Sequence, residues 1–476
     1  MVYQVLCALG EVASWSPADT TAEAHAFRYC DPALGFTLGW IYWLKYIVVI
    51  PNQLTAGAMV ISYWLDAKIV NPGVWITAFL VIILTCNYWG GWHISEYEFC
   101  LSAFKTMVIL GLMVLSLVLA LGGGPGQDGR KGFRYWKDPG AFAGDIDSTL
   151  GKFYAVCRTM QSATFAYLGS ELVGMNIVQT QNPRKTTRRA VNLTFRRIFV
   201  FHVTSVILIG MLVPYNSKHL AGATTLPRSA AAPAFVVAID LANIRSLPSI
   251  LNACILLFVV SSANYSLNRA TRALYLLSRN KHAPAILSRV DRRGVPICAL
   301  GLCSALAGLA YMNISSDSRV LFGYFVNLVS MFGILAWISI LVTHIAFVQA
   351  RKAQGVPDEA LAFRAPFGRL GSLITLMCCV FVSLMRCFDL FDRPSRFDYQ
   401  AFVTSYVGIP LYLALVVGYK FATWSSASTP KADMWADKAQ FDQSEQNTTA
   451  AGLIVEDNAR SRRHRWKERF IGAWLL

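Results

Sequence analysis

Apolar runs separated by short polar gaps constrain this chain more than any other feature. A helix needs about 20 mostly apolar residues to cross the hydrocarbon core of a bilayer. Only 15% of the residues are charged, against about 25% in soluble domains. The sequence therefore predicts an all-α polytopic membrane protein with a transmembrane domain over residues 1–420. The predicted spans are Gly35–Trp64, Val74–Gly90, Phe99–Leu121, Phe153–Val178, Ile198–Val213, Leu247–Asn268, Pro296–Met312, Val320–Phe347, Leu370–Arg386 and Phe402–Lys420.

An eleventh apolar segment, Met1–Ser14, is too short to span a bilayer. At about 1.5 Å per residue it gives roughly 21 Å of helix, against about 30 Å of hydrocarbon. We expect it to be the cytoplasmic half of a span whose beginning is absent.

Basic residues account for the formal charge of +16 and cluster in a few gaps, over residues 184–197, 269–293 and 351–369, and near the end of the chain. This pattern predicts that these segments are cytoplasmic, and it gives no reason to expect nucleic acid binding. We expect residues 421–476 to form a cytoplasmic tail. Its basic and aromatic end, Arg465–Leu476, is predicted to bind anionic lipid of the inner leaflet, with a plain disordered tail as the alternative.

The run Phe153–Val178 contains an acid, Glu171, between Gly169 and Gly174. A carboxylate at mid-membrane depth costs about 2.5–3.5 kcal/mol on insertion scales. Glycines weaken the helix around it, and such breaks free backbone groups to bind a polar solute. We therefore predict a broken helix whose Glu171 faces a hydrated pocket. The alternative is a glycine packing face with a buried acid that is hydrogen-bonded to another helix.

Other polar residues inside the spans could line the same pocket: Lys45, Gln53, Thr55, Asn264 and Asn327. Lys45 has two interpretations, because its ammonium could snorkel to the cytoplasmic face or stand as a positive charge that faces the solute cavity, toward Glu171. An isolated asparagine could equally form an interhelical hydrogen bond of about 0.6 kcal/mol. Taken together, these residues predict the walls of one water-accessible cavity.

Enzymatic chemistry has no support in the sequence. No cysteine or histidine spacing matches a zinc or redox site, and we find neither a phosphate-binding loop nor a catalytic triad in a suitable context. We predict a protein that is not an enzyme and that uses no metal or cofactor.

Several motifs in the same order resemble the fungal amino-acid permeases of the amino acid–polyamine–organocation superfamily. The resemblance extends over essentially the whole chain. Its motifs are Gly10-Glu11 with Pro17, Asp31–Phe36, Pro51–Ala56, Phe165–Gly174, Asn182–Lys185, Leu212–Tyr215, Ser262–Asn264, Arg272–Tyr275 and Arg292–Pro296.

This resemblance implies a leucine-transporter-like bundle of twelve helices with two inverted repeats, in which the first and sixth helices are broken around the substrate. It implies proton/amino-acid symport across the plasma membrane by alternating access. The substrate ammonium would be held by carbonyls around Phe165, Ala166 and Gly169, and Glu171 would be the coupling or gating carboxylate. The full set of predicted site residues is Phe165, Ala166, Tyr167, Gly169, Ser170, Thr55, Asn264 and Asn327 for the substrate, and Glu171, Lys45 and Gln53 for coupling or gating.

Two departures from the family leave alternatives open. The family's first helix is missing, which indicates a wrongly chosen first methionine or a truncated, inactive paralogue. Many members also carry Glu where this chain has Gln53. A non-transporting amino-acid sensor is the competing function.

Overall fold

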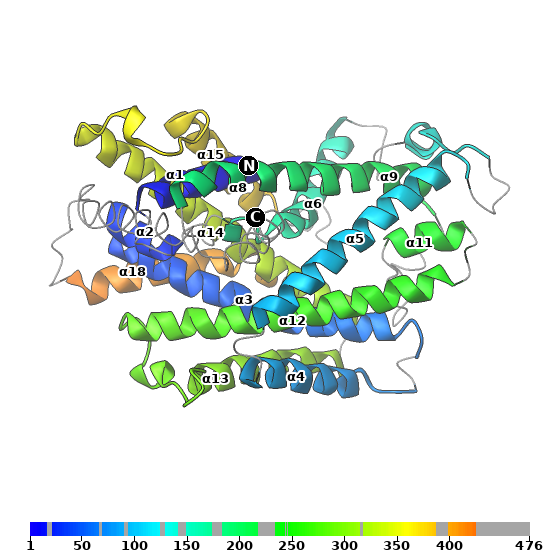
Figure 1. The fold of residues 1–476 in the computed structure, drawn as a ribbon, viewed down its shortest axis with the longest axis horizontal. Coiled ribbons are helices and arrows are strands. Elements are labelled where there is room, and N and C mark those ends of the chain that lie inside the picture. Colours follow the sequence, from blue (N-terminus) through cyan, green and yellow to red (C-terminus); the bar gives the residue numbers. More distant parts are fainter. Residues whose placement is uncertain are drawn as a thin grey trace, which may run out of the picture.

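Helices make up the regular structure that the computed structural model describes, and no strand occurs in that part of the chain (Figure 1). The described residues are 1–16, 21–65, 69–89, 94–123, 129–140, 149–173, 183–217, 234–242, 244, 246–314, 318–386 and 398–424. Within them, eight helices are long and apolar enough to cross a membrane. The prediction of an all-α polytopic membrane protein is therefore confirmed.

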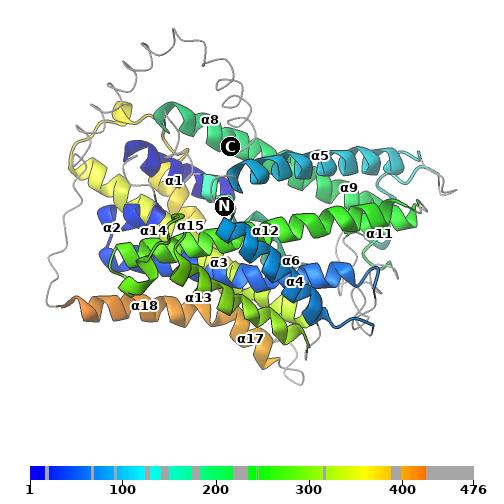
Figure 2. The same cartoon turned by 60° about the horizontal axis from the view of Figure 1, so that its bottom comes forward.

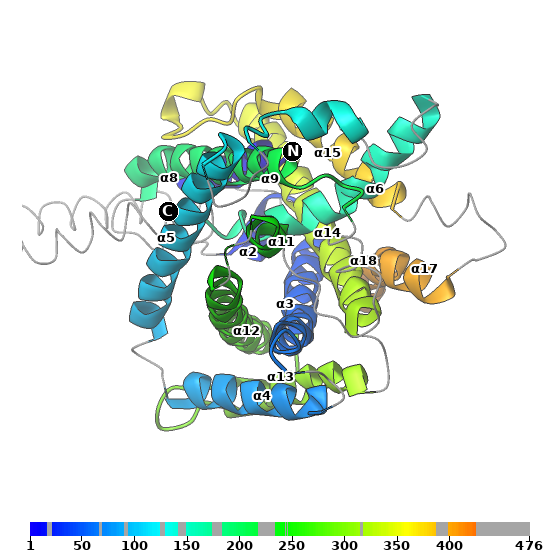
Figure 3. The same ribbon diagram turned by 90° about the vertical axis from the view of Figure 1, so that its right-hand side faces the viewer.

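Two long helices, α3 (Pro32–Ile61) and α14 (Ser318–Ala353), form the centre of the bundle. Most of the apolar window of each is buried, 67% in α3 and 78% in α14. Seen end-on in Figure 3, α3 lies between α14 and α12 (Leu247–Arg279). Elements that contact these helices are therefore well placed to build a site at the centre of the molecule.

The remaining elements surround this centre, with α8 and α18 on opposite sides (Figure 2). The helices of the first half are α1 (Val2–Trp15), α2 (Ala22–Tyr29), α4 (Pro72–Trp89), α5 (Ile94–Ala120), α6 (Thr149–Tyr167), α8 (Pro183–Ile198), α9 (Thr204–Leu212) and α11 (Ala234–Leu241). Those of the second half are α13 (Ile297–Ala307), α15 (Gly368–Leu384), α17 (Tyr399–Tyr406) and α18 (Gly408–Ala422). Short π and 3-10 segments are η1 (Trp136–Gly140), η2 (Phe199–Val203), η3 (Ala285–Ser288), η4 (Gly308–Ile314) and η5 (Asp358–Ala360).

The start of α3 shows how local sequence fixes an element. Asp31 is the N-cap, and its Oδ1 accepts a hydrogen bond from Ala33 N at 2.7 Å. Pro32 follows at the first helical position, where its missing N–H costs nothing. The cap and the proline therefore fix where α3 begins.

Three helices extend well beyond the apolar runs that predicted them. The structure continues α12 to Arg279 and α14 to Ala353, and it places residues 183–198, predicted as a basic loop, in α8. In α8 the buried positions are Thr187, Ala190, Val191 and Thr194, which is the spacing of an amphipathic helix. Arginines on the other face can remain solvated, so a basic stretch is compatible with helix.

The outer helices expose apolar side chains, as expected of a surface that faces lipid. Met107 of α5 and Phe421 of α18 are 69% and 72% exposed. The predicted lipid-binding end Arg465–Leu476, and the predicted tail beyond residue 424, lie outside the described residues.

Candidate functional site

The helix containing the acid is interrupted, as the sequence predicts. Helix α6 ends at Tyr167, and turns replace it from Leu168 to Glu171. Gly169 has a φ of +97°, a conformation that L side chains with a Cβ rarely adopt. Hydrogen bonds typical of turns, such as that from Leu172 N to Gly169 O at 3.1 Å, stabilise the interruption.

Glu171 is fully buried and accepts bonds from three elements. Its Oε1 forms an ion pair with Lys45 Nζ of α3. Its Oε2 accepts from Gly169 N at 2.9 Å and from Trp337 Nε1 of α14 at 3.1 Å. One carboxylate therefore fastens the break to both central helices.

Lys45 is 3% exposed and does not snorkel to the surface. Its ammonium lies 5.5 Å and 5.8 Å from the ring centroids of Tyr42 and Tyr46, within cation–π range. Of the two interpretations raised by the sequence, the structure shows the positive charge beside Glu171.

Leu168, at the interruption of α6, packs closely against Gly333 of α14. A Cβ built on Gly333 would lie 2.2 Å from Leu168 Cδ2. The absence of a side chain at Gly333 therefore makes room for Leu168, the first residue after α6.

Beside the break lies a cavity of about 710 Å³ between α5, α8, η2, α11 and α12. Four of the predicted substrate residues line it: Ala166, Tyr167, Gly169 and Ser170. Glu171 does not line it. Three donors enclose the carboxylate behind the interrupted backbone, and its exposure to a hydrated pocket stays a prediction.

Two cations, Lys105 of α5 and Arg197 of α8, are the charged side chains among the described residues of the cavity wall. Lys105 Nζ donates to Ser261 Oγ at 3.1 Å. The ring of Tyr167 stacks on His202, with centroids 5.0 Å apart. The cavity is thus apolar for the most part and positive where it is charged.

The other predicted site residues lie apart from this cavity. Asn264 Oδ1 accepts a bond from Asn87 Nδ2 of α4 at 2.8 Å, and Asn327 is buried in α14. Gln53 and Phe165 are half-buried. The structure brings Lys45 to Glu171 but does not bring the asparagines to the cavity wall, so their role stays a prediction.

Thr55 and its neighbour Asn52 on α3 are buried with side-chain polar atoms that have no hydrogen-bond partner among the described residues. An unmade buried bond costs about 1–3 kcal/mol. These atoms therefore mark a stretch of α3, about two to three turns beyond Lys45, that water or a polar solute would stabilise.

Sequence reasoning missed Trp337, Lys105 and Asn87. A tryptophan in the apolar run Val320–Phe347 gives no signal of its own, since aromatic residues pack in most buried helices. Lys105 carried a usable signal, as a cation inside an otherwise apolar span.

Comparison with known proteins identifies the family of this chain. The family profile described as amino acid permease matches residues 1–429. The chain is 43% identical over 480 residues to the dicarboxylic amino acid permease of Saccharomyces cerevisiae, covering 99% of this chain and 78% of that protein. It is 38% identical over 425 residues to an uncharacterized amino-acid permease of Schizosaccharomyces pombe, with 88% and 80% covered. The lysine-specific permease of Saccharomyces cerevisiae is 32% identical over 424 residues, with 88% and 67% covered. With its apolar helices, its interrupted α6 and this match over most of its length, the chain belongs to the amino acid permease family.

Proposed function

We propose that this protein is a proton/amino-acid symporter of the plasma membrane that works by alternating access, and that it is not an enzyme. The observation that carries the proposal is the Lys45–Glu171 ion pair at the interruption of α6. A carboxylate that joins a broken helix to the two central helices can couple its own protonation to their relative position. Protonation of Glu171 would cancel the attraction for Lys45 and loosen the break.

The carbonyls around Phe165, Ala166 and Gly169 are proposed to bind the ammonium of the amino acid. Phe165 O and Gly169 O accept turn-type bonds from Leu168 N and Leu172 N, and the second lone pair of such a carbonyl can accept from a cation. Tyr167 and Ser170 line the same cavity and are proposed to contact the substrate.

Acidic amino acids are the substrate class that the cavity fits best. Its charged lining side chains among the described residues are Lys105 and Arg197, which suit a second carboxylate. The relative with 43% identity is named a dicarboxylic amino acid permease, which supports the same class.

The orientation is proposed from the charge pattern. Basic residues at Arg269–Arg293 and Arg351–Arg369 put these segments, and with them the C-terminus, on the cytoplasmic side. The proposed binding of Arg465–Leu476 to anionic lipid of the inner leaflet depends on this orientation.

Uptake by purified protein in liposomes tests the proposal. We expect an acid-outside gradient to drive accumulation of labelled aspartate or glutamate, and lysine to be carried poorly. Glu171→Gln is expected to abolish gradient-driven accumulation, while Glu359→Gln, at an exposed position of η5, leaves it unchanged. Saturable amino-acid binding without flux would favour a sensor, and accumulation by Glu171→Gln at the parent rate would remove Glu171 from the coupling step.

A further inference from the structure

A second pocket, of about 390 Å³, lies between the end of α14 and the start of α15, on the face that the charge pattern assigns to the cytoplasm. It does not contact the cavity at the break of α6, since the two share no lining residue. Four basic side chains line it: Arg351, Lys352, Arg364 and Arg369.

These cations are only partly neutralised. Asp358 forms ion pairs with Arg351 Nη1 at 2.6 Å and with Arg364 Nη1 at 2.8 Å, and the Arg351 guanidinium holds the pKa of Asp358 below its usual value. No carboxylate of the described residues forms an ion pair with Lys352 or Arg369. One carboxylate is therefore shared by two arginines, and two further cations lie beside it.

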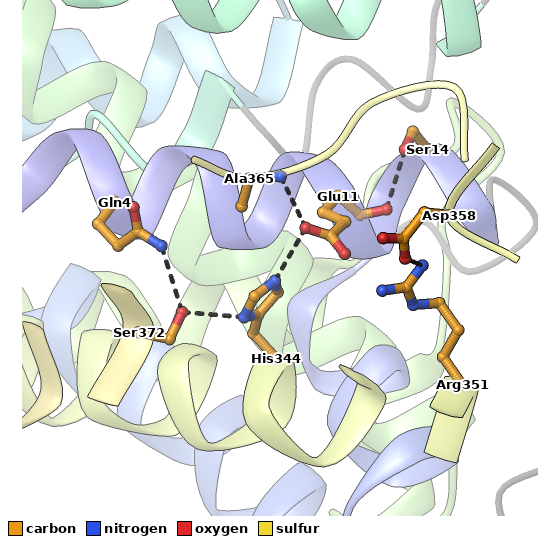
Figure 4. Close-up of polar contacts among 8 residues, drawn as sticks. All are labelled: Gln4, Glu11, Ser14, His344, Arg351, Asp358, Ala365 and Ser372. Atoms are coloured by element: carbon orange, nitrogen blue, oxygen red, sulfur yellow. Dashed lines mark hydrogen bonds and ion pairs between the residues drawn. The ribbon is translucent and has the colours of Figure 1, made fainter. Parts of the chain in front are cut away.

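Arg351 is itself unusual, because its side chain is 97% buried yet incompletely bonded. It is 3% exposed, and its Nε has no hydrogen-bond partner in the described part of the chain. Figure 4 shows its guanidinium beside Asp358. A buried guanidinium with an unused donor is expected to gain from a further anion at the pocket.

Glu11 also lines the pocket, but its carboxylate does not neutralise the basic side chains there. Glu11 of α1 is buried, and its Oε2 accepts from Ala365 N at 2.7 Å and contacts His344 Nε2 at 3.2 Å (Figure 4). His344 Nδ1 is in turn 2.9 Å from Ser372 Oγ. The Glu11 carboxylate is therefore already committed to two protein donors.

Helix α15 begins at the pocket without a side-chain cap. Its N-cap residue, Phe367, has a φ of +61° and no capping hydrogen bond. The first-turn N–H groups of a helix and its dipole favour a negative group. The N-terminus of α15 and the four basic side chains thus all present positive charge to the pocket.

The other wall of the pocket is apolar and faces outward. Phe367, Leu370 and Leu373 line it, and Phe367 and Leu370 are 83% and 63% exposed. Ile374 and Met377 are also exposed and continue the same stripe along α15, at the spacing of one helix face. A soluble anion would make no use of this stripe, whereas an acyl chain would lie along it.

We propose that this pocket binds an anionic phospholipid, with the headgroup phosphate among Arg351, Lys352, Arg364 and Arg369 and an acyl chain along the apolar stripe of α15. The site is separate from the proposed transport site, and only its assignment to the inner leaflet depends on the proposed orientation. Lys352 and Arg369 are exposed, so they can be replaced by alanine while the buried ion pair of Arg351 with Asp358 is kept.

The test is native mass spectrometry and thermal unfolding of the purified full chain in nanodiscs of phosphatidylcholine, with and without phosphatidylserine. The probe variant is Lys352→Ala/Arg369→Ala. Its matched control, Lys281→Ala/Arg292→Ala, removes two exposed cations from another basic segment. Unfolding in phosphatidylcholine alone checks that each variant is folded.

We expect the parent and the control to retain bound phosphatidylserine and to unfold at higher temperature with it. The probe variant should bind it roughly 30-fold more weakly, which is about 2 kcal/mol at 1.4 kcal/mol per factor of ten. Equal retention and an equal thermal shift in the probe variant would overturn the proposal. An equal shift with inorganic phosphate in phosphatidylcholine nanodiscs would overturn the lipid assignment, because it would show that a soluble anion occupies the pocket. Neither outcome depends on transport activity.

Discussion

Replacing Glu171 by Gln removes one buried charge and almost preserves the shape of the side chain. The amide oxygen can still accept from Gly169 N and Trp337 Nε1, now 2.9 Å and 3.1 Å from the carboxylate. Lys45, however, is left 3% exposed without its counter-charge. Breaking a buried pair by removing one partner typically costs about 3–5 kcal/mol, so we expect Glu171→Gln to lower the free energy of unfolding by about that amount.

The reciprocal change and the double variant separate charge from shape. Lys45→Met leaves Glu171 with two neutral donors and should be destabilised to a similar degree. Lys45→Met/Glu171→Gln removes both charges, and buried pairs replaced by uncharged side chains are often close to neutral in stability. We therefore expect the double variant to be more stable than either single variant, and still unable to accumulate substrate against a gradient.

Unfolding of each variant in nanodiscs of one lipid composition measures the change in stability. Uptake by the same variants measures the loss of substrate accumulation. Additive losses in the double variant would refute the argument from charge pairing, because residues in direct contact should not behave independently. A loss of stability below about 1 kcal/mol in Glu171→Gln would also refute this argument, since a loss of that size is expected for an exposed ion pair.

Three further changes test particular contacts. Gly169→Ala should lose about 1–2 kcal/mol of stability, because residue 169 has a φ of +97° that alanine rarely adopts. A clash adds nothing, since the nearest atom to a Cβ built on Gly169 is Leu172 Cδ1 at 4.0 Å. The control Gly301→Ala, in open space within α13, should be neutral or slightly stabilising in the same unfolding assay. Gly333→Ala places a Cβ 2.2 Å from Leu168 Cδ2 and should cost about 1–3 kcal/mol, and a smaller side chain at Leu168 should restore both stability and uptake. Burial raises the pKa of Glu23, in the short helix α2, to about 7; the folded state then binds the proton more tightly, so stability should fall as pH rises from about 4.5 to about 7 and level off above. Glu23→Gln should flatten that slope, and an unchanged pH profile would contradict the assignment.

The spans and the break were predictable for a simple reason. Long apolar runs mark the helices, and Gly169 next to Glu171 combines backbone freedom with an acid that lipid excludes. The pairing of Lys45 with Glu171 could be raised from the sequence only as one of two interpretations, because the choice depends on which way α3 is rotated. That rotation is set by packing against α12 and α14.

The parts that sequence reasoning did not reach depend on contacts between distant segments. Trp337 bonds to Glu171 from an apolar run with no local sign of it, and Asn264 pairs with Asn87 across 177 residues of sequence. The expected single cavity depends on such contacts too: polar residues within spans were assumed to share one wall, whereas Asn264 of α12 is bonded to Asn87 of α4. Helix ends also moved outward, because hydropathy marks the lipid-facing length and not the full helix.

The Glu11 carboxylate ties α1 to two segments that lie 333 and 354 residues further along the chain. It holds α1 to His344 of α14 and to the backbone just before α15. Any opening that draws α1 away from α14 must therefore separate a fully enclosed carboxylate from an imidazole and an amide at once. We therefore expect these three segments to move together as one rigid unit.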